Sequence, residues 1–191
     1  WPTPAVPLFF RGFFDADSTH QIDQERMAPK FVEVLGQWGV VVLETADLLI
    51  RPFRDDDLDV FAAIVADSVT MKHWPQPLTR EVAAKWVARQ QELMEQPGYG
   101  RRILVLKATG EVIGDAGLLL LELMGRERND LGYIIDHRFH GRGLATQAAA
   151  AMRDHAFENG VADLWANMAV DHPASRRVAE KVGMHLVATF V

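Results

Sequence analysis

The sequence of 191 residues predicts one mixed α/β domain. The first observation is a succession of strand-like and helix-like periodicities from residue 43 onward, in the order strand, two helices, three strands, helix, strand, helix, strand. The second is a glycine-rich loop, Arg138–Gly143, that joins a predicted strand to a predicted helix. Strands that alternate with helices in this way are typical of one layered structure around a single core.

Composition and charge exclude several classes of protein. The chain is 49% hydrophobic and 24% charged, as in ordinary globular proteins, and its net charge of −6 does not favour a nucleic-acid partner. The absence of cysteine excludes disulfides, thiolate metal sites and a cysteine nucleophile. The longest apolar run, Val60–Ala66, is far shorter than the roughly 20 residues that cross a bilayer. The segment 1–14 carries three prolines and no basic stretch, so we expect no signal peptide and a cytoplasmic protein.

Each predicted element has a local signal. Pro52 closes a strand at Leu48–Pro52, acidic residues open a helix at Asp55–Ala66, and Thr79 is a suitable N-cap for a second helix that ends before Gly98. The remaining predictions are strands Ile103–Lys107, Val112–Leu121 and Asp130–Asp136, helix Ala145–Glu158, strand Leu164–Val170, helix Pro173–Val182 and strand Met184–Val191.

The glycine-rich loop carries the chemical signal. Gly141 and Gly143 allow a tight turn and a close approach of the backbone to a ligand. The N–H groups of residues 141–146 converge at a helix N-terminus, which is an anion site, and Arg142 adds a positive charge. The motif fits neither a Walker A loop nor a dinucleotide fingerprint, because Leu144-Ala145 and Thr146 stand where those motifs need other residues. A phosphate-bearing ligand is expected, and a turn without any ligand stays the alternative.

The loop and its context resemble a known family. Arg-x-x-Gly-x-Gly before a helix is similar to the coenzyme A loop of the GNAT acetyltransferases. Further segments resemble the branch that contains the ribosomal-protein N-terminal acetyltransferases: Leu43-Glu44-Thr45, the run from Leu48 to Arg54, Trp74-Pro75, the run from Asp130 to Asp136, and the run from Pro173 to Met184. The resemblance covers residues 43–191, and it leaves 1–42 as an N-terminal extension that is either a docked strand or foreign to the natural chain.

The resemblance implies a fold and a co-substrate. The expected sheet is mixed and mostly antiparallel, with a splayed pair of parallel strands and flanking helices. Acetyl-CoA is expected in the splay, and a primary amine of a small molecule or a protein N-terminus is expected to attack its thioester directly, without a metal. The implied coenzyme contacts are Ile134 and Ile135 for the pantetheine, His172, and Arg138, Gly141, Arg142, Gly143, Ala145 and Thr146 around the pyrophosphate.

The catalytic groups are less well defined. Asp130 occupies the family's acidic position and is expected to accept the amine proton, with Glu122 and Glu127 as alternatives, although a solvated strand-end carboxylate explains Asp130 equally well. Many relatives carry a tyrosine where this chain has Ala179, so Ser175 is the expected proton donor to the thiolate; helix capping is its alternative role.

Other polar and aromatic side chains receive structural explanations. His172 stands where the family commonly has asparagine, and a coenzyme-binding role is expected for it. His137 and His140 have a spacing that occurs in metal sites, but a pair of loop histidines is the preferred interpretation. Trp74 and Trp86 are expected in the core or in the wall of an acceptor pocket.

The termini raise a question of pairing. The last strand has no strand after it to cover its edge, and exposed edges invite pairing. We expect Ala5–Phe14 or Val40–Leu43 to pair with residues 184–191, within this chain or in a homodimer. Residues 66–80 and 122–130 are expected to be acceptor loops. The predicted function is N-acetyltransfer, and the alternative is a non-catalytic acyl-CoA-binding module of the same fold.

Overall fold

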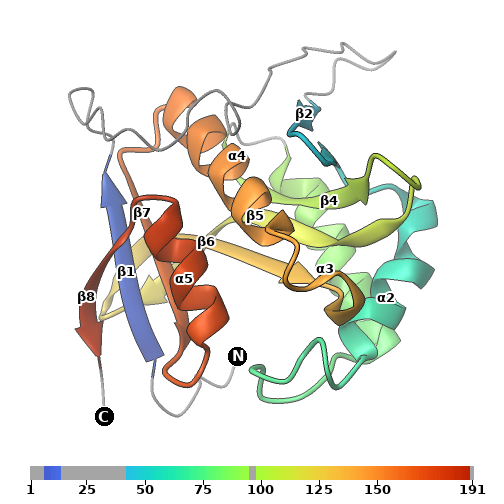
Figure 1. The fold of residues 1–191 in the computed structure, drawn as a ribbon, viewed down its shortest axis with the longest axis horizontal. Coiled ribbons are helices and arrows are strands. Elements are labelled where there is room, and N and C mark those ends of the chain that lie inside the picture. The colour runs from blue at the N-terminus through green and yellow to red at the C-terminus, as the bar shows by residue number, and fades with distance from the viewer. Residues whose placement is uncertain (1–6, 14–41, 95–97, 190–191) are drawn as a thin grey trace.

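An eight-stranded sheet forms the centre of the molecule (Figure 1). The computed structural model describes residues 7–13, 42–94 and 98–189. The strand order is β2-β3-β4-β5-β6-β7-β1-β8, and all neighbouring strands are antiparallel except β6 and β7. The strands are β1 (Pro7–Phe13), β2 (Leu43–Glu44), β3 (Leu48–Arg51), β4 (Gly100–Leu106), β5 (Val112–Leu123), β6 (Arg126–Ile135), β7 (Asp163–Ala169) and β8 (His185–Thr189). The predicted mixed sheet with one parallel pair is confirmed.

Helices cover both faces of this sheet. They are α2 (Leu58–Ala66), α3 (Arg80–Leu93), α4 (Leu144–Glu158) and α5 (Pro173–Lys181), with short 3₁₀ turns η1 (Asp55–Asp57) and η2 (His137–Phe139). The predicted cap of α3 is confirmed, because Thr79 Oγ1 accepts a hydrogen bond of 3.4 Å from Val82 N–H. None of the described helices has the length and apolarity needed to cross a membrane.

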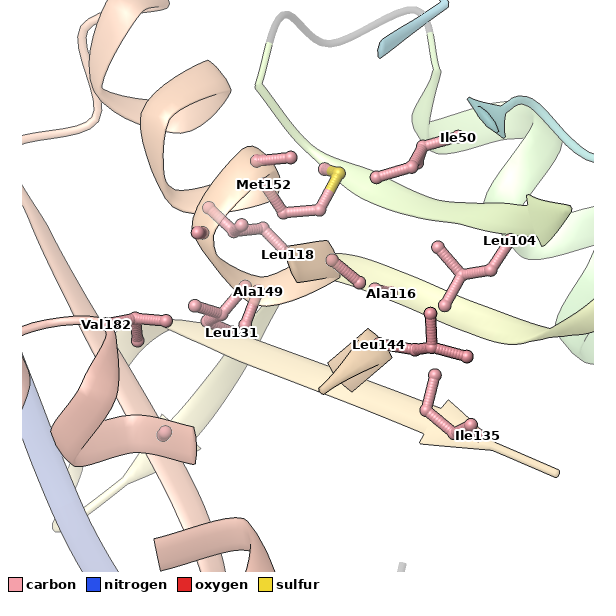
Figure 2. Packing of buried hydrophobic residues seen from close by; sticks show 14 of the residues in the cluster. Ile50, Leu104, Ala116, Leu118, Leu131, Ile135, Leu144, Ala149, Met152 and Val182 are labelled. Atoms are coloured by element: carbon pink, nitrogen blue, oxygen red, sulfur yellow. The ribbon is translucent and has the colours of Figure 1, made fainter. Parts of the chain in front are cut away.

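The two larger apolar cores of the described residues lie on opposite faces of the sheet. The larger core joins α4 and α5 to the sheet, and Figure 2 shows Leu144 and Met152 of α4 against Leu118 of β5 and Ile135 of β6. The smaller core holds α2 and α3 against β4 and β6 through Phe61, Val65, Trp86, Ile103 and Ile134. The site described below lies where the larger core ends, between β6, β7 and α5.

The segment expected to be an acceptor loop at 122–130 is instead the end of a long hairpin. β5 and β6 pair without interruption from Gly114 opposite Ile135 to Leu123 opposite Arg126. The turn is only Met124-Gly125, both with positive φ. The expected loop conformation was wrong, because the charged residues near the tip are mostly exposed and give a paired strand the composition of a loop. The expected role of this segment toward the acceptor stays a prediction.

The N-terminal strand lies inside the sheet. β1 is antiparallel to β7 on one side and to β8 on the other, so the Pro7–Phe13 part of the predicted segment pairs with the C-terminal strand (Figure 1). Leu43 pairs with Ile50 at the opposite edge, so its alternative pairing with the C-terminal strand was wrong. The rest of the predicted extension lies largely outside the described residues. β1 thus joins the C-terminal strand to the rest of the sheet.

The packing of β1 predicts the effect of truncating Phe10, whose side chain is fully buried in the larger core. Phe10→Ala is expected to lower the free energy of unfolding by about 3–5 kcal/mol. The matched control is Leu186→Ala on β8, opposite Phe10 but 45% exposed, which should cost less than about 1 kcal/mol. Urea unfolding measures both. Equal losses in the two variants would contradict the central position of β1.

Candidate active site

The site begins where two parallel strands separate. β6 and β7 are paired only at Asp130 opposite Trp165, and beyond that pair the next residues of both strands, 131–133 and 166–169, line a cavity. Asp130 Oδ1 accepts hydrogen bonds from the backbone N–H of Asn167 at 3.0 Å and from its side-chain amide at 2.8 Å. One carboxylate oxygen therefore holds β7 at the point where the ladder ends, and the backbone beyond that point faces a gap.

A cavity of about 400 Å³ occupies this gap. Its walls come from β5, β6 and β7, from the turn at His73-Trp74-Pro75, from Trp86 of α3 and from the inner side of α5. Pockets for small molecules commonly have about 300–1,000 Å³ and mix apolar walls with a few polar groups. The cavity therefore has the size and lining of a small-molecule site.

Asp130 is a buried member of the cavity wall, 4% exposed. Burial raises the pKa of Asp130, while the hydrogen bonds from Asn167 and the positive charge of Arg101 act in the opposite direction. Its alternatives differ in position. Glu122 is exposed at the cavity wall, whereas Glu127 is exposed and is not part of the lining.

A buried ion pair supports the floor of the cavity. Arg101 Nη1 lies 3.2 Å from Asp115 Oδ1, and Trp86 Nε1–H donates to Asp115 Oδ2 at 2.9 Å. Burial raises the pKa of Asp115, and the neighbouring Arg101 opposes that shift. The Arg101 guanidinium lies against Gly132, where an added Cβ would collide with Nη2. A larger residue at position 132 would therefore require the ion-paired Arg101 side chain to move.

A pair of hydroxyl groups faces the same cavity. Tyr133 Oη lies 2.8 Å from Ser175 Oγ and also donates to the Ser175 carbonyl at 3.2 Å. Burial raises the pKa of Tyr133 to about 12, so its phenol stays protonated near neutral pH. In the sequence Tyr133 is only one residue of the Leu-Gly-Tyr strand, and the position where many relatives carry a tyrosine is Ala179. The structure brings a phenol to the serine from β6 instead.

His172 forms the N-cap of α5. Its Nδ1 accepts a hydrogen bond of 3.3 Å from Ser175 N–H, so the histidine replaces the asparagine of the family pattern in this role. Burial, together with the nearby His73, lowers the pKa of His172 to about 4. The His172 ring therefore stays neutral near pH 7, with Nδ1 as acceptor and Nε2 carrying the proton. His172 lines the cavity, as do Asp130 and Ser175.

The glycine-rich loop lies outside the cavity lining, at the start of α4. Gly141 and Gly143 have a φ of 76°, and Gly143 caps the helix without a side chain. Within the described part of the chain, the backbone N–H groups of residues 141–146 have no protein acceptor. Residues 140–143 are exposed, so this row of donors is open to an anion from outside.

The two loop arginines differ in their surroundings. Arg138 Nε and Nη2 donate to Asp136 Oδ2 at 2.9 and 2.6 Å. Although burial alone raises the pKa of Asp136, these bonds and the charge of Arg138 hold it below its usual value. Arg142 is exposed, with its guanidinium 5.5 Å from the Phe139 ring. Arg142 is therefore the more available of the two cations for a ligand phosphate.

The two isoleucines of β6 also differ. The N–H of Ile134 is directed to Asp115 on β5. The carbonyl of Ile135 lies on the side of the splay and is 2.7 Å from His140 Nε2. Backbone groups alternate in direction along a strand, so Tyr133 and Ile135 are the residues of β6 that present backbone to the gap.

The two tryptophans and the histidine pair singled out in the sequence lie in different surroundings. Trp74 and Trp86 pack edge to face at 6.4 Å and both line the cavity, so they belong to a core and to a pocket wall at once. His137 lies 2.9 Å from Asp67 Oδ1, away from the His140 contact with Ile135. No group of three or more His, Asp or Glu side chains that could hold a metal occurs in residues 7–13, 42–94 and 98–189.

Comparisons with known proteins place this geometry in a family. Residues 47–185 match the model of the acetyltransferase (GNAT) domain. The chain is 29% identical over 151 residues to the uncharacterized protein YkkB of Bacillus subtilis, covering 77% of this chain and 87% of that protein. It is 26% identical over 115 residues to the ribosomal-protein-serine acetyltransferase of Escherichia coli, covering 60% of this chain and 63% of that protein.

A solved structure of an acetyltransferase has a similar fold. The acetyltransferase from Agrobacterium tumefaciens superposes with a TM-score of 0.65 at 26% identity, covering 74% of this chain and 82% of that one. The family model spans well over half of the sequence and includes the parallel strand pair, the glycine-rich loop and α5. The chain belongs to the GNAT acetyltransferase family.

Proposed function

We propose that this protein transfers the acetyl group of acetyl-CoA to a primary amine. The observation that carries the proposal is the joint presence of an open row of N–H donors at residues 141–146 and a cavity at the splay of β6 and β7. The first suits a pyrophosphate and the second suits a thioester with its acceptor. Residues 43–191, with β1 completing the sheet, form the proposed catalytic domain.

The residues present fit the coenzyme. An added Cβ at Gly141 or Gly143 would meet nothing within 4 Å, so these glycines leave open space beside the unpaired donors. The proposed pyrophosphate contacts are the backbone N–H groups of Gly141, Arg142, Gly143, Ala145 and Thr146. Arg142 adds charge from its side chain, and Arg138 shapes the loop through Asp136. The pantetheine arm is proposed to lie along Tyr133 and Ile135 toward His172.

The cavity supplies what direct attack requires. The thioester provides the acetyl group, and the amine must approach its carbonyl carbon as a neutral nucleophile. Tyr133 and Ser175 form a hydroxyl pair that is proposed to deliver a proton to the departing thiolate, and the Tyr133 phenol, with a pKa of about 12, is protonated at neutral pH before the transfer. Asp130 is proposed to fix the width of the splay through Asn167. The Glu122 carboxylate at the wall attracts a cationic amine, which has to lose one proton to solvent before it attacks as a neutral nucleophile.

The acceptor is proposed to be a small amine or a protein N-terminus. The similarity to a ribosomal-protein-serine acetyltransferase supports a protein N-terminus. The cavity volume of about 400 Å³ and its two tryptophans suit a compact amine equally well. A panel that contains both classes therefore belongs in the first assay.

Release of free thiol from acetyl-CoA tests the proposed function. The protein has no cysteine, so it adds no thiol background. With a panel of polyamines, amino compounds and short peptides with free N-termini, we expect release that requires both protein and amine. Binding of acetyl-CoA without release by any amine would favour the alternative, a non-catalytic acyl-CoA-binding module. Absence of binding would contradict both functions.

The coenzyme loop predicts a difference between two glycines of the same helix. Gly143 precedes α4 and Gly160 follows it, with φ of 76° and 83° and open space beside both. Leucine at either position costs roughly 1–2 kcal/mol because L residues resist positive φ. Acetyl-CoA at about 100 times its Kd should stabilise the wild type and Gly160→Leu by roughly 2.7 kcal/mol. Gly143→Leu should lose this stabilisation. Thermal unfolding with and without acetyl-CoA measures it, and equal stabilisation of both variants would refute the assignment of the loop.

The hydroxyl pair predicts a difference between the two tyrosines of the chain. Tyr133→Phe removes the phenol beside Ser175, so kcat should fall about 100-fold, in the range typical of a lost proton donor. The affinity for acetyl-CoA should stay unchanged. Tyr99→Phe is the matched control, because the Tyr99 hydroxyl bonds Asn129 and does not line the cavity. Steady-state kinetics that show equal kcat for Tyr133→Phe and Tyr99→Phe would exclude Tyr133 as donor.

A further inference from the structure

A second histidine lies at the cavity wall, outside the motifs of the sequence. His73 belongs to the turn after α2 and lines the cavity together with Trp74 and Pro75. Its ring is stacked on His172, with 3.9 Å between ring centroids and 22° between planes. Its Nδ1 lies 3.5 Å from Asp171 Oδ1. Through these contacts, the turn between α2 and α3 touches the start of α5 at the cavity wall.

The contacts of His73 give its two nitrogens different roles. The Asp171 carboxylate lies 3.5 Å from Nδ1, at the outer limit of hydrogen-bond distance, so a proton on Nδ1 faces a negative charge and the lone pair is left on Nε2. A carboxylate on the Nδ1 side of an imidazole is the usual neighbour of a histidine base, and a small movement of the exposed Asp171 side chain would bring it into hydrogen-bond distance. The His73 side chain is 20% exposed and that of Asp171 is 78% exposed. A proton taken from the cavity at His73 therefore has a short route to solvent.

The neighbouring groups are less suited to accept a proton. His172 uses its Nδ1 lone pair for Ser175 N–H, and its lowered pKa of about 4 keeps it neutral. Asp130 has one oxygen occupied by two donors from Asn167 and is buried away from solvent. His172 therefore serves as an uncharged ring on which His73 stacks, and Asp130 serves to hold β7 against β6.

We propose that His73 is the catalytic base that takes the proton of the acceptor amine, with Asp171 as its positioning residue. The assignment rests on the proposed acetyl transfer. The nitrogen forms a bond to the acetyl carbonyl carbon as one N–H proton passes to His73 Nε2. The C–S bond then breaks, the thiolate takes a proton from the Tyr133–Ser175 pair, and solvent restores that pair. His73 returns its proton to solvent beside Asp171. The products are the amide and coenzyme A.

Variants that separate the base from the ring stack test this assignment. His73→Phe keeps an aromatic ring against His172 but has no lone pair, and His73→Ala leaves space for free imidazole. General bases contribute about 10²–10⁴-fold, so both variants should lose at least about 100-fold in kcat. Their affinity for acetyl-CoA, measured by calorimetry, should stay at the wild-type value. Added imidazole should accelerate His73→Ala in proportion to its concentration and leave His73→Phe unchanged.

Control variants complete the experiment. His185→Gln alters an exposed histidine of β8 that does not line the cavity, and it should keep wild-type kcat. Asp171→Asn should lower kcat by a smaller factor than His73→Phe. The assignment is overturned if His73→Phe has a kcat close to that of the wild type, or if imidazole fails to accelerate His73→Ala. Failure of the proposed function itself is distinguishable, because the wild-type protein would then release no thiol with any amine.

Discussion

The parting of β6 and β7 is the feature on which the site depends. Two parallel strands that paired along their full length would leave no room between them, since neighbouring strands lie only about 5 Å apart. Here the pairing is limited to Asp130 and Trp165, and the carboxylate of Asp130 binds the Asn167 backbone where the next ladder bond would otherwise form. The cavity opens directly beyond this junction, and Tyr133, Ser175 and His172 line it.

A buried ion pair supports β6 next to this junction. Asp115 and Arg101 form an ion pair below Gly132, and Trp86 satisfies the second oxygen of the carboxylate. Removing one partner of such a pair leaves an uncompensated charge, which typically costs about 3–5 kcal/mol. The pair thus fixes the strand that carries Tyr133 from one face, while α4 and α5 fix it from the other (Figure 2). The groups proposed to handle protons stand on this fixed strand and at the capped start of α5.

The sequence predicted the elements whose signals are local. Examples are the loop at Gly141 and Gly143, the cap at Thr79, and the order of strands and helices from residue 48 onward, each of which depends on a few neighbouring residues. The family model matches the residues that carry these motifs. The hairpin tip at 122–130 was mistaken for a loop because exposed charges conceal a paired backbone. The segment Ala5–Phe14 was one of two expected partners of the C-terminal strand, and only the fold distinguishes them by placing Leu43 at the far edge.

Ser175 was expected as a proton donor, but the partners of the groups proposed to handle protons were beyond prediction for a different reason. Tyr133 and Ser175 lie 42 positions apart in the sequence, and His73 and Asp171 lie far apart as well. No spacing rule connects such pairs, because their contact depends on how a turn and a helix end meet over the splay. Residues 66–80 carried no pattern that indicates a substrate, although their turn supplies His73 and Trp74 to the cavity wall.

A crystal structure of the protein with acetyl-CoA would test the central claim most directly. The account predicts pyrophosphate oxygens within hydrogen-bonding distance of the backbone N–H groups of residues 141–146. It also predicts the thioester in the splay of β6 and β7, beside Tyr133 and Ser175. A coenzyme bound elsewhere, with the loop at Gly141 and Gly143 free of phosphate, would contradict the claim.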